Sequence, residues 1–360
     1  MIYDRADQNP GANFLFVLAC LVVVVHGLRF AAPILLPSAL ALFLTVLSLP
    51  VMLWLRERRV PAWLAVALTV LVNMAAVAIL ALVVSQSISE LQTQLPRYLT
   101  GIQRLQESWL VAVESRTGVV LTQYITMDLI DPAAVIDFAR GAVGRVAQFL
   151  SMTFIVFLIM AFMLGEAMVF PAKFRHILGG VSQNEDRLNK FVTEIQTYLG
   201  IKTIISLATG AILGLWAFFT DLDFPLLLGL LAFVLNYVPT VGSILAAVPA
   251  LMLSLILVGS VGHAVLVLVG YVTVNTIFGN ILEPSLMGRR LGLSTLVVIL
   301  SLLFWGWAWG PLGALLSVPL TVIVKIWLEN TKDLRWVAIL IDKAPPADPV
   351  DVPPAVETVG

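Results

Sequence analysis

Long apolar runs that carry almost no charge constrain this chain more than any other feature of its sequence. Residues 14–55 contain one charged side chain, Arg29, and residues 62–86 contain none. A helix of about 20 residues crosses the roughly 30 Å hydrocarbon core of a bilayer, so runs of this length are typical of membrane spans. The predicted spans are residues 14–28, 34–55, 62–86, 148–168, 200–220 and 261–282.

Composition agrees with a membrane protein and excludes several other classes. Hydrophobic residues make up 60% of the chain and charged residues 12%, whereas soluble domains carry about 25% charged residues. A formal net charge of −1 gives no reason to expect a nucleic acid partner. Cys20 is the single cysteine and the three histidines are scattered, so we expect no disulfide framework, metal or cofactor. No catalytic triad or carboxylate pair falls at one membrane depth, and an enzyme is not predicted.

Basic residues in the loops predict the orientation. The loop "RERRVP" at 56–61 has three arginines and belongs on the cytoplasmic side by the positive-inside rule. Two spans precede this loop, so the N-terminus is expected on the same, cytoplasmic side. The same rule places "MGRR" at 287–290 and the C-terminal tail with Lys332 and Arg335 in the cytoplasm. Lys202, near the start of the fifth span, is expected to extend its ammonium group to the interface.

Residues 87–147 are polar, carry charges of both signs and contain no spanning run. Apolar residues at spacings of three and four indicate an amphipathic helix in this outer segment. These residues are Ile88, Leu91, Leu95, Tyr98, Ile102, Leu105 and Trp109. Two interpretations remain open: this helix lies on its own membrane domain, or it forms a seam between subunits.

Two apolar segments are interrupted near their middles. Residues 224–258 contain "NYVPTVGS" at 236–243, and residues 291–328 contain "WGPLG" at 309–313. Hydrocarbon admits non-helical backbone only where protein or water covers it, and each arm is shorter than the about 20 residues of a span. Both segments are therefore predicted to be re-entrant helical hairpins, with kinked helices or full spans as alternatives. Paired interruptions of this kind indicate a transporter binding site.

Polar and helix-breaking residues at these places are the candidate solute or ion path. Spacings of three, four and three place four candidates, Thr273, Thr276, Asn280 and Glu283, within an arc of about 80° around one helix. The candidates are Asn236, Pro239, Thr240, Gly242 and Ser243 at the first break, Thr273, Thr276, Asn280 and Glu283 on that helix, and Gly310, Pro311 and Gly313 at the second break.

Three of these predictions have a structural alternative. Glu283 is either a coupling carboxylate, since acidic residues within spans are costly and functional by default, or a helix-end residue before Pro284. Asn236 either contacts the solute or ties its own hairpin together. The tryptophans at 305, 307 and 309 either line a solute path or anchor the chain at the membrane interface.

The stretches "NYVPTVGSILAAVPA", "NILEPSLMGRRLGLSTLVV" and "WGWAWGPLGALLSVPL" resemble the autoinducer-2 exporter family of bacterial permeases. The resemblance extends over most of the chain. It implies a bacterial inner-membrane protein that moves small solutes outward, autoinducer-2 for some members and Na⁺ against H⁺ for others. It also implies homo-oligomers, with pentamers suggested. Asn236 and Tyr237 depart from what relatives often have there, so the substrate does not carry over.

The sequence thus predicts an all-α polytopic membrane protein with about six full spans, two broken hairpins and an amphipathic outer segment. The expected function is a secondary transporter that exports a small polar solute by alternating access at a site between the two hairpin tips. The alternatives are a Na⁺(Li⁺)/H⁺ antiporter and a non-transporting membrane scaffold. The predicted regions are 1–86 and 148–222 for membrane helices, 87–147 for the outer segment, 223–330 for the hairpin-bearing transport region and 331–360 for the Pro-rich tail.

Overall fold

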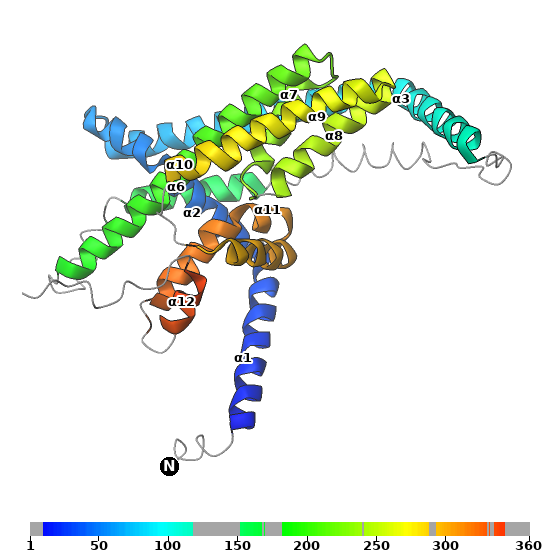
Figure 1. Ribbon diagram of the computed structural model, residues 1–360. Helices are drawn as coiled ribbons and strands as arrows, with labels where there is room; N and C mark the ends of the chain where they lie inside the picture. The colour runs from blue at the N-terminus through cyan, green and yellow to red at the C-terminus, as the bar shows by residue number, and fades with distance from the viewer. Residues whose placement is uncertain are drawn as a thin grey trace, which may run out of the picture. The chain divides into compact units, whose positions relative to one another are not determined.

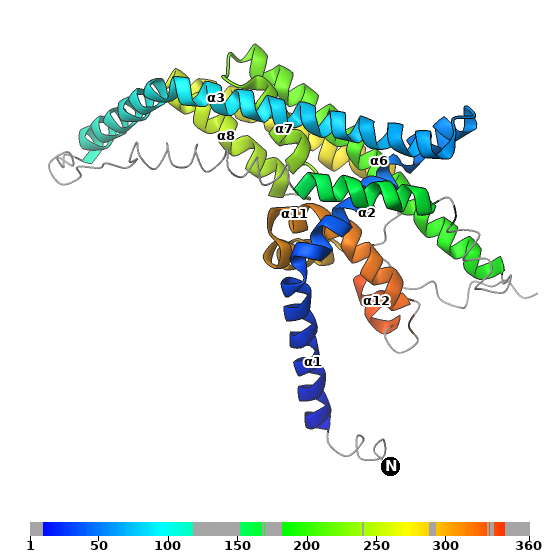
Figure 2. The ribbon, with the colours of Figure 1, turned by 180° about the vertical axis from the view of Figure 1, so that it is seen from behind.

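The protein is predominantly helical in the part that the computed structural model describes (Figures 1 and 2). The described residues are 10–117, 152–167, 169, 182–239, 241–287, 293–329, 331 and 335–342. They form two compact units, Met1–Gly288 and Arg289–Gly360. Large apolar side chains such as Phe16, Phe162 and Phe219 are exposed on the first unit, as expected for a surface in contact with lipid.

The first unit holds most of the helices. They are α1 (Pro10–Phe30), α2 (Ala32–Glu57), α3 (Ala62–Thr117), the helix Met152–Ala167, α6 (Ser182–Phe219), α7 (Pro225–Leu235), α8 (Val241–Val258), α9 (Val261–Asn275), the π-helix η3 (Thr276–Leu282) and α10 (Glu283–Met287). The second unit holds α11 (Thr295–Glu329) and α12 (Arg335–Ile341). Among the described residues, 6 helical stretches are long and apolar enough to cross a membrane: α2, the first part of α3, the second part of α6, α8, α9 with η3 and α10, and α11. Two of the predicted spans, 14–28 and 148–168, correspond to the shorter apolar helices Phe14–Phe30 and Met152–Ala167. The predicted all-α polytopic membrane fold is confirmed.

The third span and the described part of the outer segment, up to Thr117, are one helix. α3 has 56 residues and continues through Pro96 to Thr117, well past its apolar part, Ala62–Gln94. Beyond the apolar part, Tyr98 is buried, and a Cβ at Gly101 would overlap the backbone carbonyl of Ile256 in α8. At these two residues the helix lies on its own membrane domain, which is the first of the two interpretations. Residues 118–147 lie outside the described part.

α7 and α8 are the two arms of a hairpin. Asp223, just before α7, and Ile256, near the end of α8, both contact α3 around residues 98–101. His263 of α9 likewise contacts Thr220, before α7, and Ser254 of α8. Both ends of the hairpin therefore lie together, and the break at Asn236–Pro239 forms its tip. The arms have 11 and 18 residues, which is a less even division than the sequence indicated.

The hairpin reaches only part of the way along α6. Asn236 hydrogen-bonds to Ser206 of α6, while the beginning of the hairpin lies beside Thr220 at the other end of the same helix. At 1.5 Å per residue, Ser206 and Thr220 are about 21 Å apart along α6. This distance is shorter than the roughly 30 Å hydrocarbon core, so the geometry favours a re-entrant hairpin over two full spans.

The second unit contains a hairpin of the same kind. Gly310 has φ 71° and ψ −157°, which interrupts α11 in its middle. Ser301 donates a hydrogen bond to the Ser317 carbonyl at 2.9 Å, and the Trp305 indole N–H donates to the Thr321 hydroxyl at 3.2 Å. The two halves of α11 therefore run back along each other. The predicted second hairpin is confirmed, and the 35 residues of α11 are not one straight span.

Candidate functional site at the first hairpin tip

One face of α6 carries polar side chains that are buried inside the first unit. Tyr198, Lys202, Ser206 and Thr209 follow at spacings of four, four and three, and each is at most 8% exposed. Such spacing puts all four on one side of a helix. Polar groups in an apolar interior cost free energy unless they are paired, so the partners of this face define the site.

Lys202 and Glu283 form an ion pair across the first unit. The Lys202 ammonium donates to both carboxylate oxygens of Glu283, at 2.6 and 2.8 Å. The side chains are 4% and 20% exposed, respectively. Tyr198 lies near enough to interact electrostatically with the Glu283 carboxylate. The pair therefore links α6 to α10 inside the first unit.

A change of helix type positions Glu283. The backbone changes from α-helix to π-helix at Thr276–Leu282 and returns to α-helix at Glu283. A π-helical turn contains more residues than an α-helical turn, so the faces before and after it are rotated relative to each other. Short π-helical segments are frequent at functional sites. Here the rotation turns Glu283 toward α6.

The hairpin tip contacts α6 through two side chains. The Asn236 amide donates to the Ser206 hydroxyl at 2.9 Å, and the Tyr237 hydroxyl donates to the Thr203 hydroxyl at 2.7 Å. Tyr237 also packs edge-on against Phe43 of α2 and Phe233 of α7. Asn236 and Tyr237 are both buried. The tip is thus held one helical turn from Lys202.

Glycines allow the arms of the hairpin to pack this closely. A Cβ at Gly242 would overlap the carbonyl oxygen of Leu235 on the opposite arm. Gly210 of α6 and Gly229 of α7 lie against each other's backbone carbonyls, with Gly214 beside Gly229. Backbones in membrane proteins approach closely where such small residues line the contact.

The other predicted residues of the first unit are less close to this network. Pro239 and Ser243 are half-buried at the tip, and Thr240 lies outside the described residues. Thr273, Thr276 and Asn280 are exposed on the unit's surface, although Glu283 is turned inward. The prediction that these four share one face assumed a uniform α-helix. It is wrong because η3 changes the angle per residue between Thr276 and Glu283.

In the second unit, Gly310 forms the bend and Pro311 beside it is exposed. Gly313 is buried, and a Cβ there would overlap the carbonyl oxygen of Trp305. Trp305 and Trp309 are buried, whereas Trp307 is 55% exposed. These residues therefore shape the second hairpin.

Sequence reasoning missed four residues of the network: Tyr198, Lys202, Ser206 and Tyr237. Lys202 was expected to reach the interface, but its ammonium group is buried on Glu283. The available signal was a lysine inside an apolar span, which is unusual unless it has a partner. The hydroxyl residues gave no comparable signal, because serine and tyrosine are common in membrane helices.

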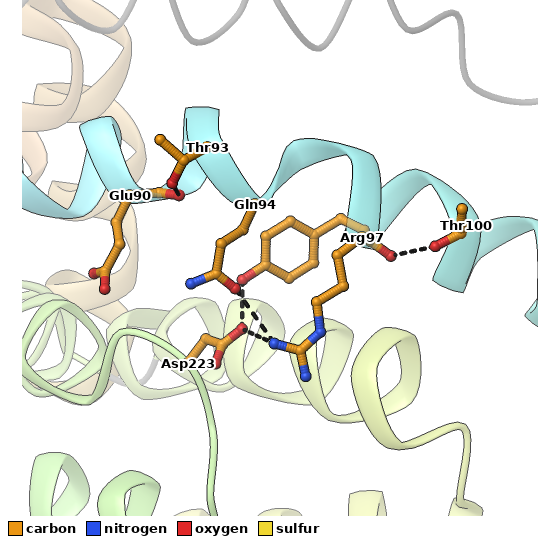
Figure 3. Close-up of polar contacts among 7 residues, drawn as sticks. Glu90, Thr93, Gln94, Arg97, Thr100 and Asp223 are labelled. Carbon is orange, nitrogen blue, oxygen red and sulfur yellow. Dashed lines mark hydrogen bonds and ion pairs between the residues drawn. The ribbon is translucent and has the colours of Figure 1, made fainter.

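A second polar contact fixes the opposite end of the hairpin. Tyr98 of α3 donates to Asp223 at 2.6 Å, and Arg97 lies 3.7 Å from the same carboxylate. Figure 3 shows Gln94 and Arg97 extending from α3 toward Asp223 in the turn before α7. Burial, and then the hydrogen bond to Asp223, raise the pKa of the Tyr98 phenol, so it remains a donor at neutral pH.

Comparison with known proteins also indicates a membrane transporter, and the similarity covers nearly the whole chain. Residues 18–333 match the family model described as AI-2E family transporter. The chain is 39% identical to the AI-2 transport protein TqsA of Escherichia coli, over 92% of this chain and 96% of TqsA. A Haemophilus influenzae protein is 33% identical over 91% of this chain and 95% of its own length. The Escherichia coli protein YhhT is 34% identical, with 94% and 97% covered. Both are named provisionally as transport proteins.

Proposed function

Because the chain belongs to the AI-2E transporter family, we propose that this multi-pass membrane transporter is a secondary exporter of a small polar solute. The solute would cross by alternating access, in a bacterial cytoplasmic membrane with both termini inside. TqsA is named an AI-2 transport protein, so autoinducer-2 is the first solute to test. Assembly as a homo-oligomer belongs to the same proposal.

This proposal rests on the hairpin tip. It brings the Asn236 amide and the Tyr237 hydroxyl, both from buried residues, against the Ser206 and Thr203 hydroxyls of α6. Neutral hydrogen-bonding groups suit a polar solute without net charge. Broken helices that present such groups within the bilayer are typical of transporter binding sites.

The ion pair has the position of a barrier on one side of that tip. Lys202 lies one helical turn beyond Ser206, toward the end of α6 that the positive-inside rule assigns to the cytoplasm. A bonded Lys202–Glu283 pair together with Tyr198 would close this side. Separation of the pair would open the tip to the cytoplasm and admit the solute.

Cation/proton antiport is the second candidate, and Glu283 is the observation that favours it. A carboxylate in contact with a single ammonium group can exchange that partner for a proton or for Na⁺. The expected result is cation-driven proton flux in everted vesicles that is lost in Glu283→Gln. If wild-type vesicles show no proton flux on addition of Na⁺ or Li⁺, antiport is excluded.

Uptake of labelled autoinducer-2 into everted membrane vesicles tests the exporter directly. Wild-type vesicles should accumulate it above vesicles that lack the protein, and Asn236→Leu should abolish the difference. Gln86→Leu is the matched control, since it removes an exposed amide from α3. Equal accumulation with and without the protein would refute autoinducer-2 as the solute. Full activity in Asn236→Leu would refute the site.

A further inference from the structure

The first hairpin is joined to its neighbours by two turns that each contain a residue with positive φ. Phe224, directly before α7, has φ 60° and ψ 45°, and Gly259, directly after α8, has φ 65°. Glycine adopts this left-handed region without strain, and a Cβ at position 259 would have no described atom within 4 Å. The turn after α8 is therefore permissive, whereas the turn before α7 requires an explanation.

Three features make the left-handed conformation of Phe224 unfavourable. A bulky side chain at positive φ is uncommon and costs free energy. Phe224 also precedes Pro225, and a residue before proline is pushed toward extended backbone. It is the N-cap of α7, a position that normally has extended backbone, and phenylalanine has no side-chain acceptor with which to cap a helix. Extended backbone at Phe224 would therefore be the relaxed form of this turn.

The other residue of this turn with positive φ has a local reason for its conformation. Asp221, with φ 51°, follows α6, and the Leu222 N–H donates to the Ala217 carbonyl at 3.0 Å. This is a common way for a helix to end. Phe224 begins a helix and does not end one, so the same explanation does not apply. Strained residues persist only where the surrounding structure over-determines them, so tertiary contacts must hold Phe224.

Tyr98 of α3 supplies such contacts on both sides of the strained residue. Its hydroxyl donates to the Asp223 carboxylate at 2.6 Å, and its ring packs on the Phe224 ring with centroids 6.3 Å apart. Tyr98 and Phe224 are 5% and 8% exposed. One side chain thus holds two consecutive residues of the turn, which stabilises the backbone angles between them.

The same stretch of α3 also contacts the other arm of the hairpin. Gly101, three residues after Tyr98, packs directly on the backbone carbonyl of Ile256 in α8. α3 accordingly lies beside both α7 and α8 (Figure 2). We refer to Tyr98, Gly101, Asp223, Phe224 and Ile256 together as the clasp.

A change of backbone angles at Phe224 would be transmitted to the hairpin tip. α7 connects Phe224 to Asn236, so a rotation at the first residue moves the second at a distance of about 18 Å. Gly242 packs on the Leu235 carbonyl, so the two arms move together. Gly259 can absorb the matching change at the end of α8, because hinges are a few residues at the ends of helices that accommodate large changes of φ and ψ.

We propose that Phe224 and Gly259 are the hinges of the first hairpin and that Tyr98 is the positioning residue that holds it in the described position. The inference rests on the transport function proposed above, because it assigns the movement that exposes the hairpin tip. While the clasp is closed, the Asn236 amide stays on Ser206. Release of the clasp lets Phe224 become extended, and the tip leaves α6. The outer part of α3 thereby controls access to the site.

Distances between two spin labels test the hinges without any solute. The labels are attached to Ile204→Cys in α6 and Ile244→Cys in α8 near the tip, which are 68% and 66% exposed, in a Cys20→Ser background. In lipid nanodiscs one distance should dominate, and Tyr98→Phe should raise the fraction of a longer distance severalfold. Tyr271→Phe is the matched control, since Tyr271 is also buried and its hydroxyl has no hydrogen-bond partner among the described residues.

A second variant tests the other hinge. Gly259→Ala places a Cβ at φ 65°, where side chains are strained, although no described atom is close to it. It should therefore raise the fraction of the longer distance as well, and unchanged distances would refute a hinge at Gly259. An unchanged distance in Tyr98→Phe, or an equal change in Tyr271→Phe, would overturn the proposal.

A reversible crosslink tests whether transport needs this movement. Arg97→Cys and Ile256→Cys, joined by a bifunctional methanethiosulfonate in the Cys20→Ser background, tie α3 to the hairpin while Tyr98 stays intact. Arg97 lies four residues before Gly101, on the same face of α3, and Gly101 contacts Ile256. Uptake of autoinducer-2 into everted vesicles should stop on crosslinking and return on reduction, and the same reagent should leave both single-cysteine variants active.

The two experiments distinguish failure of the hinges from failure of the exporter. Uptake that continues in the crosslinked protein would overturn the hinge proposal and leave export in place. Absence of uptake by the wild type, together with a longer distance in Tyr98→Phe, would refute autoinducer-2 export and leave the hinges in place.

Discussion

The Lys202 ammonium binds both carboxylate oxygens of Glu283, at 2.6 and 2.8 Å, although 81 positions separate the two residues along the chain. The pair joins α6 to the helix that follows η3, and it lies one turn from the hydrogen bond between Ser206 and Asn236. The first unit therefore has three features close together: an interior charge pair, a π-helical segment and a hairpin tip.

Removal of one partner of this pair should destabilise the protein more than removal of both. Glu283→Gln leaves the Lys202 ammonium buried without its counter-charge, which costs about 3–5 kcal/mol when a buried pair is broken. The double variant Lys202→Met/Glu283→Gln should recover most of that loss. Thermal unfolding in lipid nanodiscs measures the difference. Wild-type stability in Glu283→Gln would show that the pair is not buried as described.

Tyr98→Phe should loosen the outer part of α3 from the hairpin. It removes a hydrogen bond to the Asp223 carboxylate, and hydrogen bonds to charged groups contribute about 1.5–3 kcal/mol. Faster amide exchange is expected around residues 98–101. Arg97→Ala is the comparison, because an arginine side chain that is 63% exposed contributes at most about 1 kcal/mol in such a pair. Equal exchange in the two variants would contradict the assignment.

Alkaline pH should weaken the same contact. The folded state raises the pKa of the Tyr98 phenol by burial and by its hydrogen bond to Asp223. The folded protein therefore binds this proton more tightly than the unfolded chain, in which tyrosine titrates near pH 10. Stability is constant below about pH 10 and falls as the pH rises above it. The difference between wild type and Tyr98→Phe across this range isolates the effect.

Gly242→Ala should disrupt the first hairpin, whereas Gly200→Ala should not. A Cβ at position 242 overlaps the Leu235 carbonyl, which is backbone and must move, while a Cβ at position 200 has no atom within 4 Å. Within a helix, alanine is favoured over glycine by about 1 kcal/mol, so Gly200→Ala should be neutral or stabilising. Autoinducer-2 uptake and thermal unfolding report both variants. Normal uptake in Gly242→Ala would argue against a tightly packed tip.

Gly310→Ala should destabilise the second hairpin for a conformational reason. No atom lies within 4 Å of a Cβ at this position, but φ 71° with ψ −157° is a backbone region that only glycine adopts readily. The expected cost is about 1–3 kcal/mol. Pro311→Ala is a suitable control, since Pro311 is exposed and follows the bend. A stable Gly310→Ala protein would show that the bend lies elsewhere.

The sequence was informative where local chemistry decides structure. Apolar run length predicted the membrane helices, and the Pro and Gly residues at 239–242 and 310–313 predicted where helices break, because these residues remove hydrogen bonds or permit unusual backbone angles. Asn236 and Glu283 were also identified from the sequence, as polar groups that hydrocarbon would not tolerate unpaired.

The tertiary structure alone decided which of these polar groups meet. No local rule pairs Lys202 with Glu283, because the contact depends on how α6 packs on α9 and on the rotation that η3 introduces. The same rotation leaves Thr273, Thr276 and Asn280 exposed although a uniform helix would keep them beside Glu283. Periodicity fixes which residues share a face of a regular helix, but the partner of that face is set by packing between segments far apart in the chain.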